Sequence, residues 1–223
     1  MTVSAVVPTY NEESTIAGLL ENLTAAGPDE IIVSDGGSAD RTVEIARRSA
    51  QVVISPAGRA RQMNEGARKA RGDVLLFLHA DVRVEPGSLR AIREAMCDPA
   101  VVGGNLDIRY EGGDLAASAF TRINRARCRF GIFYGDSGIF CRRSFFEQEG
   151  GYREWLILED YDFARRMWRA GGVVLLSEPI YVSDRRWRKA GLLPTLWSWF
   201  WIQGLYLAGV SPERLARMYR DVR

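Results

Sequence analysis

A run of five apolar residues, Val74 to Leu78, constrains the fold of this chain more than any other feature. An unbroken apolar run of this length is typical of a strand that is buried on both faces of a parallel sheet. The run ends at His79, Ala80 and Asp81. These residues would lie at the carboxyl end of the strand, where open α/β sheets bind their ligands. We therefore expect an α/β fold with its chemistry at this strand end.

Strand-like and helix-like segments alternate along the chain. Further strands are expected at 2–7, 30–34, 51–54, 101–110, 139–141, 173–176 and 180–183, and helices follow most of them. Asn11 or Ser14 is expected to cap the first helix, and Gly27 to end it. The alternation predicts a mainly parallel sheet flanked by helices. One domain is expected over 1–190, with a helical tail over 191–223.

Composition removes several classes of function. The 223 residues carry a net charge of only +2, so nothing indicates a nucleic-acid partner. The chain has three scattered cysteines and a single histidine, which makes a structural zinc site a poor fit. Reduced thiols and a first stretch unlike a signal peptide predict a cytoplasmic protein.

Polar clusters follow three of the expected strands: Asn11-Glu12, Asp35-Gly36-Gly37 and His79-Ala80-Asp81. A single acid after a strand is usually a cap or a turn former. Three clusters at one crevice are better explained by a ligand site. The chain lacks a G-x-G-x-x-G after its first strand and a G-x-x-x-x-G-K-[ST] anywhere, which argues against dinucleotide and P-loop enzymes.

Four motifs occur in a fixed order: 6–12 (Val-Val-Pro-Thr-Tyr-Asn-Glu), 32–40 (Ile-Val-Ser-Asp-Gly-Gly-Ser-Ala-Asp), 72–81 and 158–160 (Leu-Glu-Asp). Together they resemble the family-2 glycosyltransferases, a large inverting group with a GT-A fold. Segment 59–67 and His79-Ala80-Asp81 look like a small bacterial subfamily, in which this triplet replaces the family's Asp-x-Asp. The resemblance covers roughly residues 3–190.

The resemblance implies an enzyme that moves a sugar, of hexosyl type, from a nucleotide-diphospho-sugar to a hydroxyl acceptor. The donor would usually be a UDP-sugar. The positions that the resemblance assigns to donor binding are Pro8, Thr9, Asn11, Glu12, Asp35, Arg61, Asn64, His79, Ala80 and Asp136. Of these, Asp136 would line the side of the donor sugar or the acceptor.

The resemblance also implies the catalytic groups. Asp160 would be the general base that deprotonates the acceptor hydroxyl, and Glu159 would orient its neighbours. Asp81 would bind Mg²⁺ or Mn²⁺ that bridges the donor diphosphate. His79 stands where the family has an acid. Asp81 would then be the one protein ligand, and donor phosphates and water would complete the coordination shell, as Mg²⁺ tolerates.

Two features lie towards the carboxyl end. Arg185, Arg186 and Trp187 resemble an element that covers the diphosphate in family synthases, and a basic run beside a membrane is the alternative interpretation. Residues 192–210 are uncharged and rich in tryptophan. They predict a helix on a membrane surface rather than a span. A helix that completes the core or forms a homodimer contact is the alternative. Membrane contact would favour a lipid-linked acceptor and the inner face of the membrane.

The sequence leaves two alternative functions. A sugar-1-phosphate nucleotidylyltransferase shares the α/β core, but it usually carries a Gly-rich, Arg-Lys-containing loop after its first strand, and residues 8–12 differ from that loop. A catalytically degenerate, membrane-associated subunit that binds a nucleotide-sugar is the non-enzymatic alternative. Only His79 favours it, while Asp81 and Asp160 argue against it.

Overall fold

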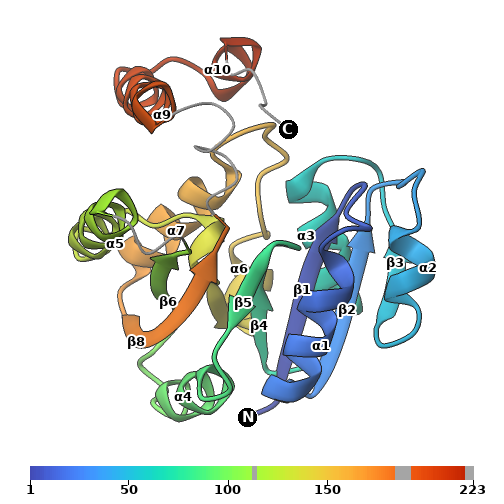
Figure 1. Ribbon diagram of the computed structural model, residues 1–223. Coiled ribbons are helices and arrows are strands. Elements are labelled where there is room, and N and C mark those ends of the chain that lie inside the picture. Colours follow the sequence, from blue (N-terminus) through green and yellow to red (C-terminus); the bar gives the residue numbers. More distant parts are fainter. Residues whose placement is uncertain (112–114, 184–191, 219–223) are drawn as a thin grey trace.

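The computed structural model describes residues 1–111, 115–183 and 192–218. Within these residues an eight-stranded sheet has the order β3-β2-β1-β4-β7-β6-β8-β5 (Figure 1). The strands are β1 (Val3–Thr9), β2 (Glu30–Asp35), β3 (Gln51–Ile54), β4 (Val74–Phe77), β5 (Val82–Val84), β6 (Gly103–Tyr110), β7 (Phe140–Arg142) and β8 (Val173–Val182). The helices are α1 (Ile16–Ala26), α2 (Thr42–Ala46), α3 (Arg59–Lys69), α4 (Ser88–Ala95), α5 (Leu115–Cys128), the 3-10 helix η1 (Gly135–Ser137), α6 (Arg143–Gln148), α7 (Glu159–Ala170), α9 (Leu192–Leu207) and α10 (Pro212–Met218).

The sheet has a parallel half and a mixed half. Strands β3, β2, β1 and β4 run parallel, so their carboxyl ends meet at one edge. Strand β7 lies antiparallel between β4 and β6, β8 is parallel to β6, and β5 is antiparallel to β8. The prediction of an α/β fold with a central sheet flanked by helices is confirmed. Most of the parallel pairing lies in the half of the sheet that contains β1 and β4.

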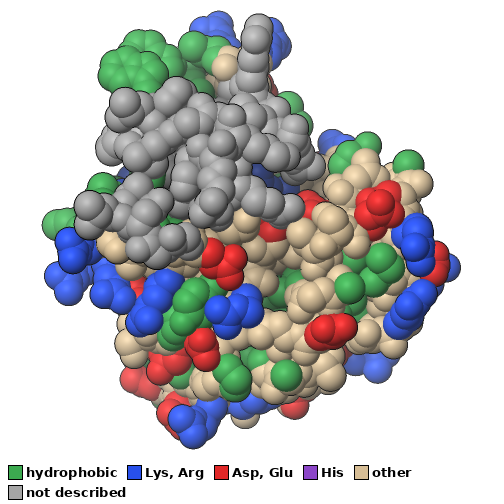
Figure 2. All heavy atoms as spheres, viewed as in Figure 1, with side chains coloured by type: hydrophobic (Ala, Val, Ile, Leu, Met, Phe, Trp, Pro, Cys, Tyr) green, Lys and Arg blue, Asp and Glu red, His purple; other side chains and the backbone are tan. Residues whose placement is uncertain are grey.

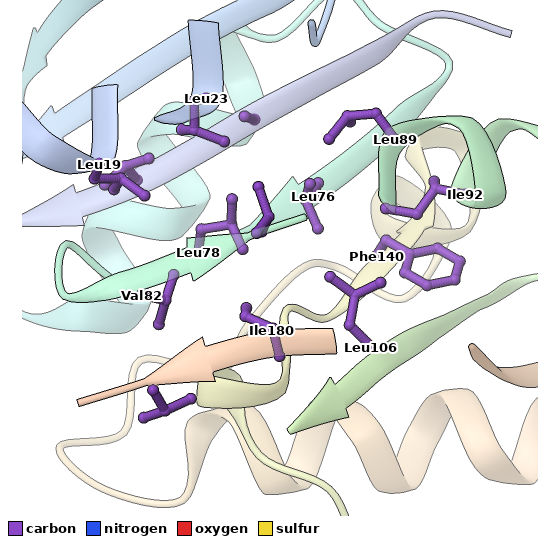
Figure 3. Packing of buried hydrophobic residues seen from close by; sticks show 14 of the residues in the cluster. Leu19, Leu23, Leu76, Leu78, Val82, Leu89, Ile92, Leu106, Phe140 and Ile180 are labelled. Atoms are coloured by element: carbon purple, nitrogen blue, oxygen red, sulfur yellow. The ribbon is translucent and has the colours of Figure 1, made fainter. Parts of the chain in front are cut away.

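Strand β4 separates the two hydrophobic cores of the molecule. Val74, Leu76 and Leu78 belong to the core under α1 and α4, part of which is drawn in Figure 3. Leu75 and Phe77 belong to the opposite core, beneath α3, α6 and α7. All five side chains are buried. Since burying one such side chain contributes about 1.5–3 kcal/mol, β4 stabilises both layers at once. The sequence-based prediction for this strand is confirmed.

Strand β8 differs from its prediction. The sequence suggested two short strands, whereas the structure has one strand that continues through Pro179. Pro179 lies opposite Asp107 of β6, next to a register shift between Asn105 and Asp107. A proline lacks the N–H group of a regular ladder, and a local irregularity lets the strand continue past it.

The start of α1 also differs from its prediction. The helix begins at Ile16, and the residue before it, Thr15, makes no capping bond with its side chain. Asn11 does not cap this helix, because its Oδ1 accepts a hydrogen bond from the backbone N–H of Ala39. The helix ends as expected at Gly27, which has the left-handed backbone (φ 76°) typical of a helix C-terminus. The short elements β5, α6 and η1 were not predicted.

Helices α9 and α10 lie together beyond one end of the sheet (Figure 1). Two of the contacts of α9 with the body are polar or aromatic: Tyr134 donates a hydrogen bond to Gln203 (2.8 Å), and Tyr206 meets the ring of Tyr161 edge-on. Within the described residues, none of the helices combines the length and the apolar character needed to cross a membrane. The boundary at residue 190 stays a prediction, because residues 184–191 lie outside the described ranges.

Candidate active site

The carboxyl ends of β1 and β2 form one wall of the candidate site. Thr9 pairs with Asp35 in the register of these strands, and Pro8 lies buried beside Ser34. Asp35 is fully buried. One of its carboxylate oxygens accepts hydrogen bonds from the N–H groups of Gly37 and Ser38, and the other from the hydroxyls of Thr9 and Ser38. Because each oxygen already accepts two bonds, Asp35 fixes the shape of the loop that follows β2.

The loop after β1 is tied to the loop after β2. Asn11 has a left-handed backbone (φ 55°), and its N–H donates to the Ser38 hydroxyl at 2.8 Å. The N–H of Glu12 donates to the Thr42 hydroxyl at 2.8 Å, and the Glu12 carboxylate accepts a bond from Thr15. These bonds order the rim of the site without a ligand.

Gln62 of α3 is a structural residue that the sequence analysis missed. Its side-chain amide is buried and donates to the backbone carbonyls of Thr9 and Ser34, at 2.5 and 3.1 Å. It therefore holds the ends of β1 and β2 together from below. A Cβ atom on Gly36 would lie 3.1 Å from the same amide, so a larger residue at position 36 would disturb this bond. A polar residue on the inward face of a helix was the one signal available.

The end of β4 meets η1 and the start of α7. Asp160 is 8% exposed, and its Oδ2 accepts a 2.7 Å hydrogen bond from the N–H of Gly135. Its Oδ1 accepts a second 2.7 Å bond, from the N–H of Tyr161. A Cβ atom on Gly135 would lie 2.9 Å from Nε2 of His79 and 3.1 Å from Oδ2 of Asp160. The histidine and the acid therefore converge on one point from segments about eighty residues apart.

The two other residues of the His-Ala-Asp triplet follow directly. Ala80 is buried and Asp81 is half-buried, in the turn that leads from β4 into β5. Asp136, in η1 next to Gly135, is also half-buried. Burial and the negative charge of Asp136 both raise the pKa of Tyr110, which lies on β6. The structure thus brings His79, Asp136 and Asp160 to the same end of the sheet, near the end of β4.

Glu159, the residue before Asp160, is directed elsewhere. Its side chain is 2% exposed and its Oε1 lies 3.1 Å from Nε of Arg59, at the start of α3. Burial raises the pKa of the Glu159 carboxyl, Arg59 opposes this effect, and the charge of Asp160 adds to it. Leu158, the residue before α7, has a left-handed backbone (φ 62°). This turn sends two consecutive acids to two different partners.

Two residues of α3 that are predicted to bind the donor, Arg61 and Asn64, contact segment 152–154, and their role in donor binding stays a prediction. Arg61 is half exposed and pairs with Glu154 at 2.8 Å. Asn64 binds both backbone groups of Tyr152: its amide donates to the carbonyl at 2.8 Å, and its oxygen accepts from the N–H at 2.9 Å. The structure therefore directs Arg61 and Asn64 to segment 152–154, and it is Arg59 that reaches the start of α7. Arg185, Arg186 and Trp187 lie outside the described residues.

The fit of a metal ion rests on Asp81. The parts of the chain that the structure describes contain no group of three or more His, Cys, Asp or Glu side chains able to hold an ion. Mg²⁺ is often bound by one or two carboxylates together with substrate phosphates and water. One half-buried carboxylate at the end of β4 fits an ion that arrives with a diphosphate, and does not fit an ion held by protein ligands alone.

Comparison with known proteins identifies the family. The sequence model described as "Glycosyl transferase family 2" matches residues 4–150. The chain belongs to glycosyl transferase family 2. The match includes the ends of β1, β2 and β4 and the η1 turn, so this wall of the site is the family-2 part of the chain. It stops before α7, which carries Glu159 and Asp160.

Curated relatives of this family-2 chain are glycosyltransferases. The undecaprenyl-phosphate 4-deoxy-4-formamido-L-arabinose transferase of Aeromonas hydrophila is 28% identical over 155 residues, which are 63% of this chain and 48% of that protein. The glycosyltransferase AglJ of Haloferax volcanii is 32% identical over 126 residues, 55% of this chain and 40% of that protein. The matches thus span half or less of these relatives' length.

Solved structures confirm the GT-A fold. Staphylococcus aureus TarS 1-349 in complex with UDP-GlcNAc has a TM-score of 0.67 at 21% identity, covering 82% of this chain and 59% of that one. Glucosyl-3-phosphoglycerate synthase of Mycobacterium tuberculosis, with Mn²⁺, UDP and glucosyl-3-phosphoglycerate, has a TM-score of 0.61 at 20% identity, covering 80% and 70%. At this level of identity the likeness concerns the fold alone.

Proposed function

We propose that this family-2 chain transfers a sugar from a nucleotide-diphospho-sugar, with a UDP-sugar as first choice, to an acceptor hydroxyl with inversion at the anomeric carbon. The observation that carries the proposal is the place of Asp160. Its carboxylate is fixed by the N–H of Gly135 and lies beside His79 at the end of β4. Both features belong to the strand edge where α/β sheets bind ligands.

Asp160 is the proposed general base. In an inverting transfer the acceptor oxygen attacks the anomeric carbon opposite the leaving diphosphate, and the hydroxyl proton must be removed during the attack. Each oxygen of Asp160 accepts one backbone hydrogen bond, so each keeps a lone pair for that proton. Glu159 is paired with Arg59 and holds the first turn of α7, which places its neighbour.

The loops after β1 and β2 are the proposed nucleoside site. Thr9, Asn11, Glu12 and Asp35 order these loops, and Pro8 and Ala80 form part of the floor. His79 is proposed to hydrogen-bond the donor, and Asp136 to line the sugar. Arg185, Arg186 and Trp187 are proposed to cover the diphosphate on the resemblance alone. Mg²⁺ or Mn²⁺ held by Asp81 and the donor would stabilise the charge that develops on the leaving diphosphate.

The proposed acceptor is lipid-linked. The Aeromonas relative is named for undecaprenyl phosphate, which supports an acceptor carried by a lipid. The inner face of the membrane is the proposed location. A hydroxyl acceptor and a phosphate acceptor differ in whether they need a base. A hydroxyl must lose a proton during attack, whereas a phosphate oxygen is already ionised at neutral pH. Dependence on Asp160 therefore distinguishes a hydroxyl acceptor from a phosphate acceptor.

The test compares wild type with Asp160→Asn, which nearly keeps the side-chain volume, removes the base and replaces one of the two hydrogen-bonded oxygens with an NH₂ group. We expect kcat for transfer to a hydroxyl acceptor to fall about 10²–10⁴-fold, while calorimetry shows donor binding retained. Asp98→Asn, at an exposed acid near the far end of α4, is the matched control and should behave as wild type. Wild-type rates in Asp160→Asn would refute the base assignment. Donor binding by wild type with neither transfer nor donor hydrolysis would favour the binding-subunit alternative.

A further inference from the structure

Helix α9 exposes large apolar side chains along one face. Trp197 is 72% exposed, Trp201 52% and Leu207 64%. The rings of Trp197 and Trp201, one helical turn apart, are stacked with centroids 6.3 Å apart and planes 11° from parallel. Figure 2 shows hydrophobic side chains gathered at the end of the molecule where α9 lies. Large apolar patches of this kind mark interaction sites, and tryptophan is enriched at membrane–water interfaces.

The orientation of α9 is fixed by its other face. Ile202 is buried at 6% exposure, Gln203 accepts the hydrogen bond from Tyr134, and Tyr206 packs against Tyr161 and Trp155. These contacts occupy the side of the helix that faces the body. The tryptophan face therefore stays directed outward, and covering it requires something from outside this part of the chain.

Positive charge lies beside the carboxyl end of α9. Arg165 and Arg169 of α7 line a groove of about 400 Å³ with Tyr206, Leu207 and Val210. The acid in this groove, Asp162, is paired with Arg166 at 2.9 Å and with Arg153 at 3.1 Å. On α10, two exposed arginines, Arg214 and Arg217, outnumber one exposed acid, Glu213. The charge at the carboxyl end of α9 and on α10 therefore suits an anionic surface.

We propose that α9 and α10 dock on an anionic phospholipid bilayer. Trp197, Trp201 and Leu207 enter the boundary between headgroups and acyl chains, and the nearby arginines bind lipid phosphates. This is how an interfacial helix binds a membrane: buried apolar area and attraction to anionic lipids add together. Arginines near such a surface are attracted to its anionic lipids, so the charge selects the lipid and the tryptophans anchor the helix.

The docking surface is connected to the candidate active site. Tyr134 and Tyr161, the body residues that hold α9, directly adjoin Gly135 and Asp160 in the sequence. A bilayer on α9 would therefore lie close to the segments that carry Gly135 and Asp160. In this respect the inference rests on the proposed function, since it gives a lipid-linked acceptor a route to the proposed base.

Vesicle co-sedimentation of the full chain, with neither donor nor acceptor present, tests the docking by itself. We expect binding to vesicles of phosphatidylcholine with phosphatidylglycerol, and weak binding to phosphatidylcholine alone. Trp197→Ala/Trp201→Ala should weaken binding about tenfold or more, and Arg165→Gln/Arg169→Gln should reduce the preference for the anionic lipid. Ile54→Ala and Arg48→Gln/Arg90→Gln, exposed residues on other elements, are the matched controls and should bind as wild type.

Depth is measured with brominated lipids, which quench tryptophan fluorescence on contact. Trp197→Phe/Trp201→Phe keeps the surface apolar, so vesicle binding should persist while the quenching falls. Unchanged quenching in this variant would overturn the proposal, as would binding unaffected by the alanine variant. A dimer that these alanine substitutions dissociate, without vesicle binding, would assign the face to a second copy and refute the proposal. Vesicle binding together with transfer only to soluble acceptors would support docking and contradict the lipid-linked acceptor.

Discussion

Gly135 is the residue at which the candidate site has least room. Its N–H binds Asp160, and a Cβ atom there would contact both His79 and Asp160. We expect Gly135→Ala to lower kcat/KM about tenfold or more, because misplacing catalytic groups by a few tenths of an ångström to 1 Å is costly. Donor-hydrolysis kinetics measure the loss of activity. Thermal unfolding measures any loss of stability separately.

The matched control for this substitution is Gly18→Ala on α1, where a Cβ atom meets nothing within 4 Å. This variant should keep full activity. Because alanine stabilises a helix by up to about 1 kcal/mol relative to glycine, it should also unfold at a slightly higher temperature. Wild-type kinetics in Gly135→Ala would mean that the proposed site is elsewhere.

Glu159 gives the chain a pH-dependent contribution to stability. Burial raises the pKa of this carboxyl above its ordinary 4.5, so the folded chain binds the proton more tightly than the unfolded chain. The contribution is fully present below pH 4.5 and is lost as pH rises through the raised pKa. The melting temperature of the wild type should fall as pH rises through this window, and we expect a smaller fall for Glu159→Gln. Glu21 is an exposed acid of α1, so Glu21→Gln should show the same fall as the wild type. Equal slopes in all three proteins would contradict the role of burial.

At the scale of residues, the sequence located the acids and the histidine because they interrupt apolar runs at strand or helix ends. It did not identify Arg59. Side chains two positions apart point to different sides of a helix, so Arg59 and Arg61 could not both face α7. Which of them does depends on how α3 packs against a segment one hundred residues away, and local pattern carries no information on that.

Among the elements, α3 is tied to the segment before α7 by Asn64, whose amide binds both backbone groups of Tyr152. Asn64→Ala leaves that N–H and carbonyl without this partner, and we expect it to lower the free energy of unfolding by about 1–3 kcal/mol in urea. Arg68→Ala is the control on the same helix, since its ion pair with Glu65 is at the surface. Such pairs contribute about 0–1 kcal/mol. If Asn64→Ala lowered the free energy of unfolding less than Arg68→Ala, the link through Asn64 would not stabilise the fold.

Elements with regular periodicity could be predicted, and those set by distant pairing could not. Strand β4 could be predicted because the five buried residues 74–78, which extend one residue beyond it, need two covering layers. Strand β8 was not, because Pro179 interrupts the local pattern and only its partner β6 shows that the ladder continues. Strand β5 has three residues and depends on β8 for its hydrogen bonds, so its own sequence gives too little pattern.

For the whole molecule, donor binding should appear as thermal stabilisation. A ligand at about 100 times its Kd stabilises the folded state by about 2.7 kcal/mol. For a chain of this size that corresponds to a rise in Tm of roughly 5–10 °C. We expect this rise with a UDP-sugar and Mn²⁺ together and a smaller one with the UDP-sugar in EDTA. Asp81→Asn should remove the part that depends on the metal, and Asp98→Asn should not.

Equal stabilisation with and without the divalent ion would argue against the role of Asp81 and leave the donor assignment intact. No stabilisation by any UDP- or GDP-sugar would argue against the donor assignment itself. The fold makes this readout informative, because the loops after β1 and β2 are already ordered by their own hydrogen bonds. Little of the binding free energy is then spent on ordering them.

The two backbone hydrogen bonds of Asp160 have a consequence for the product. A carboxylate that accepts a backbone hydrogen bond at both oxygens cannot rotate freely about its side-chain bonds, so its remaining lone pairs accept a proton from fixed directions only. On an acceptor with several hydroxyl groups, only a hydroxyl that projects along one of these directions would react. The geometry of one clamped side chain would therefore appear as regioselectivity, a single linkage position in every molecule of product.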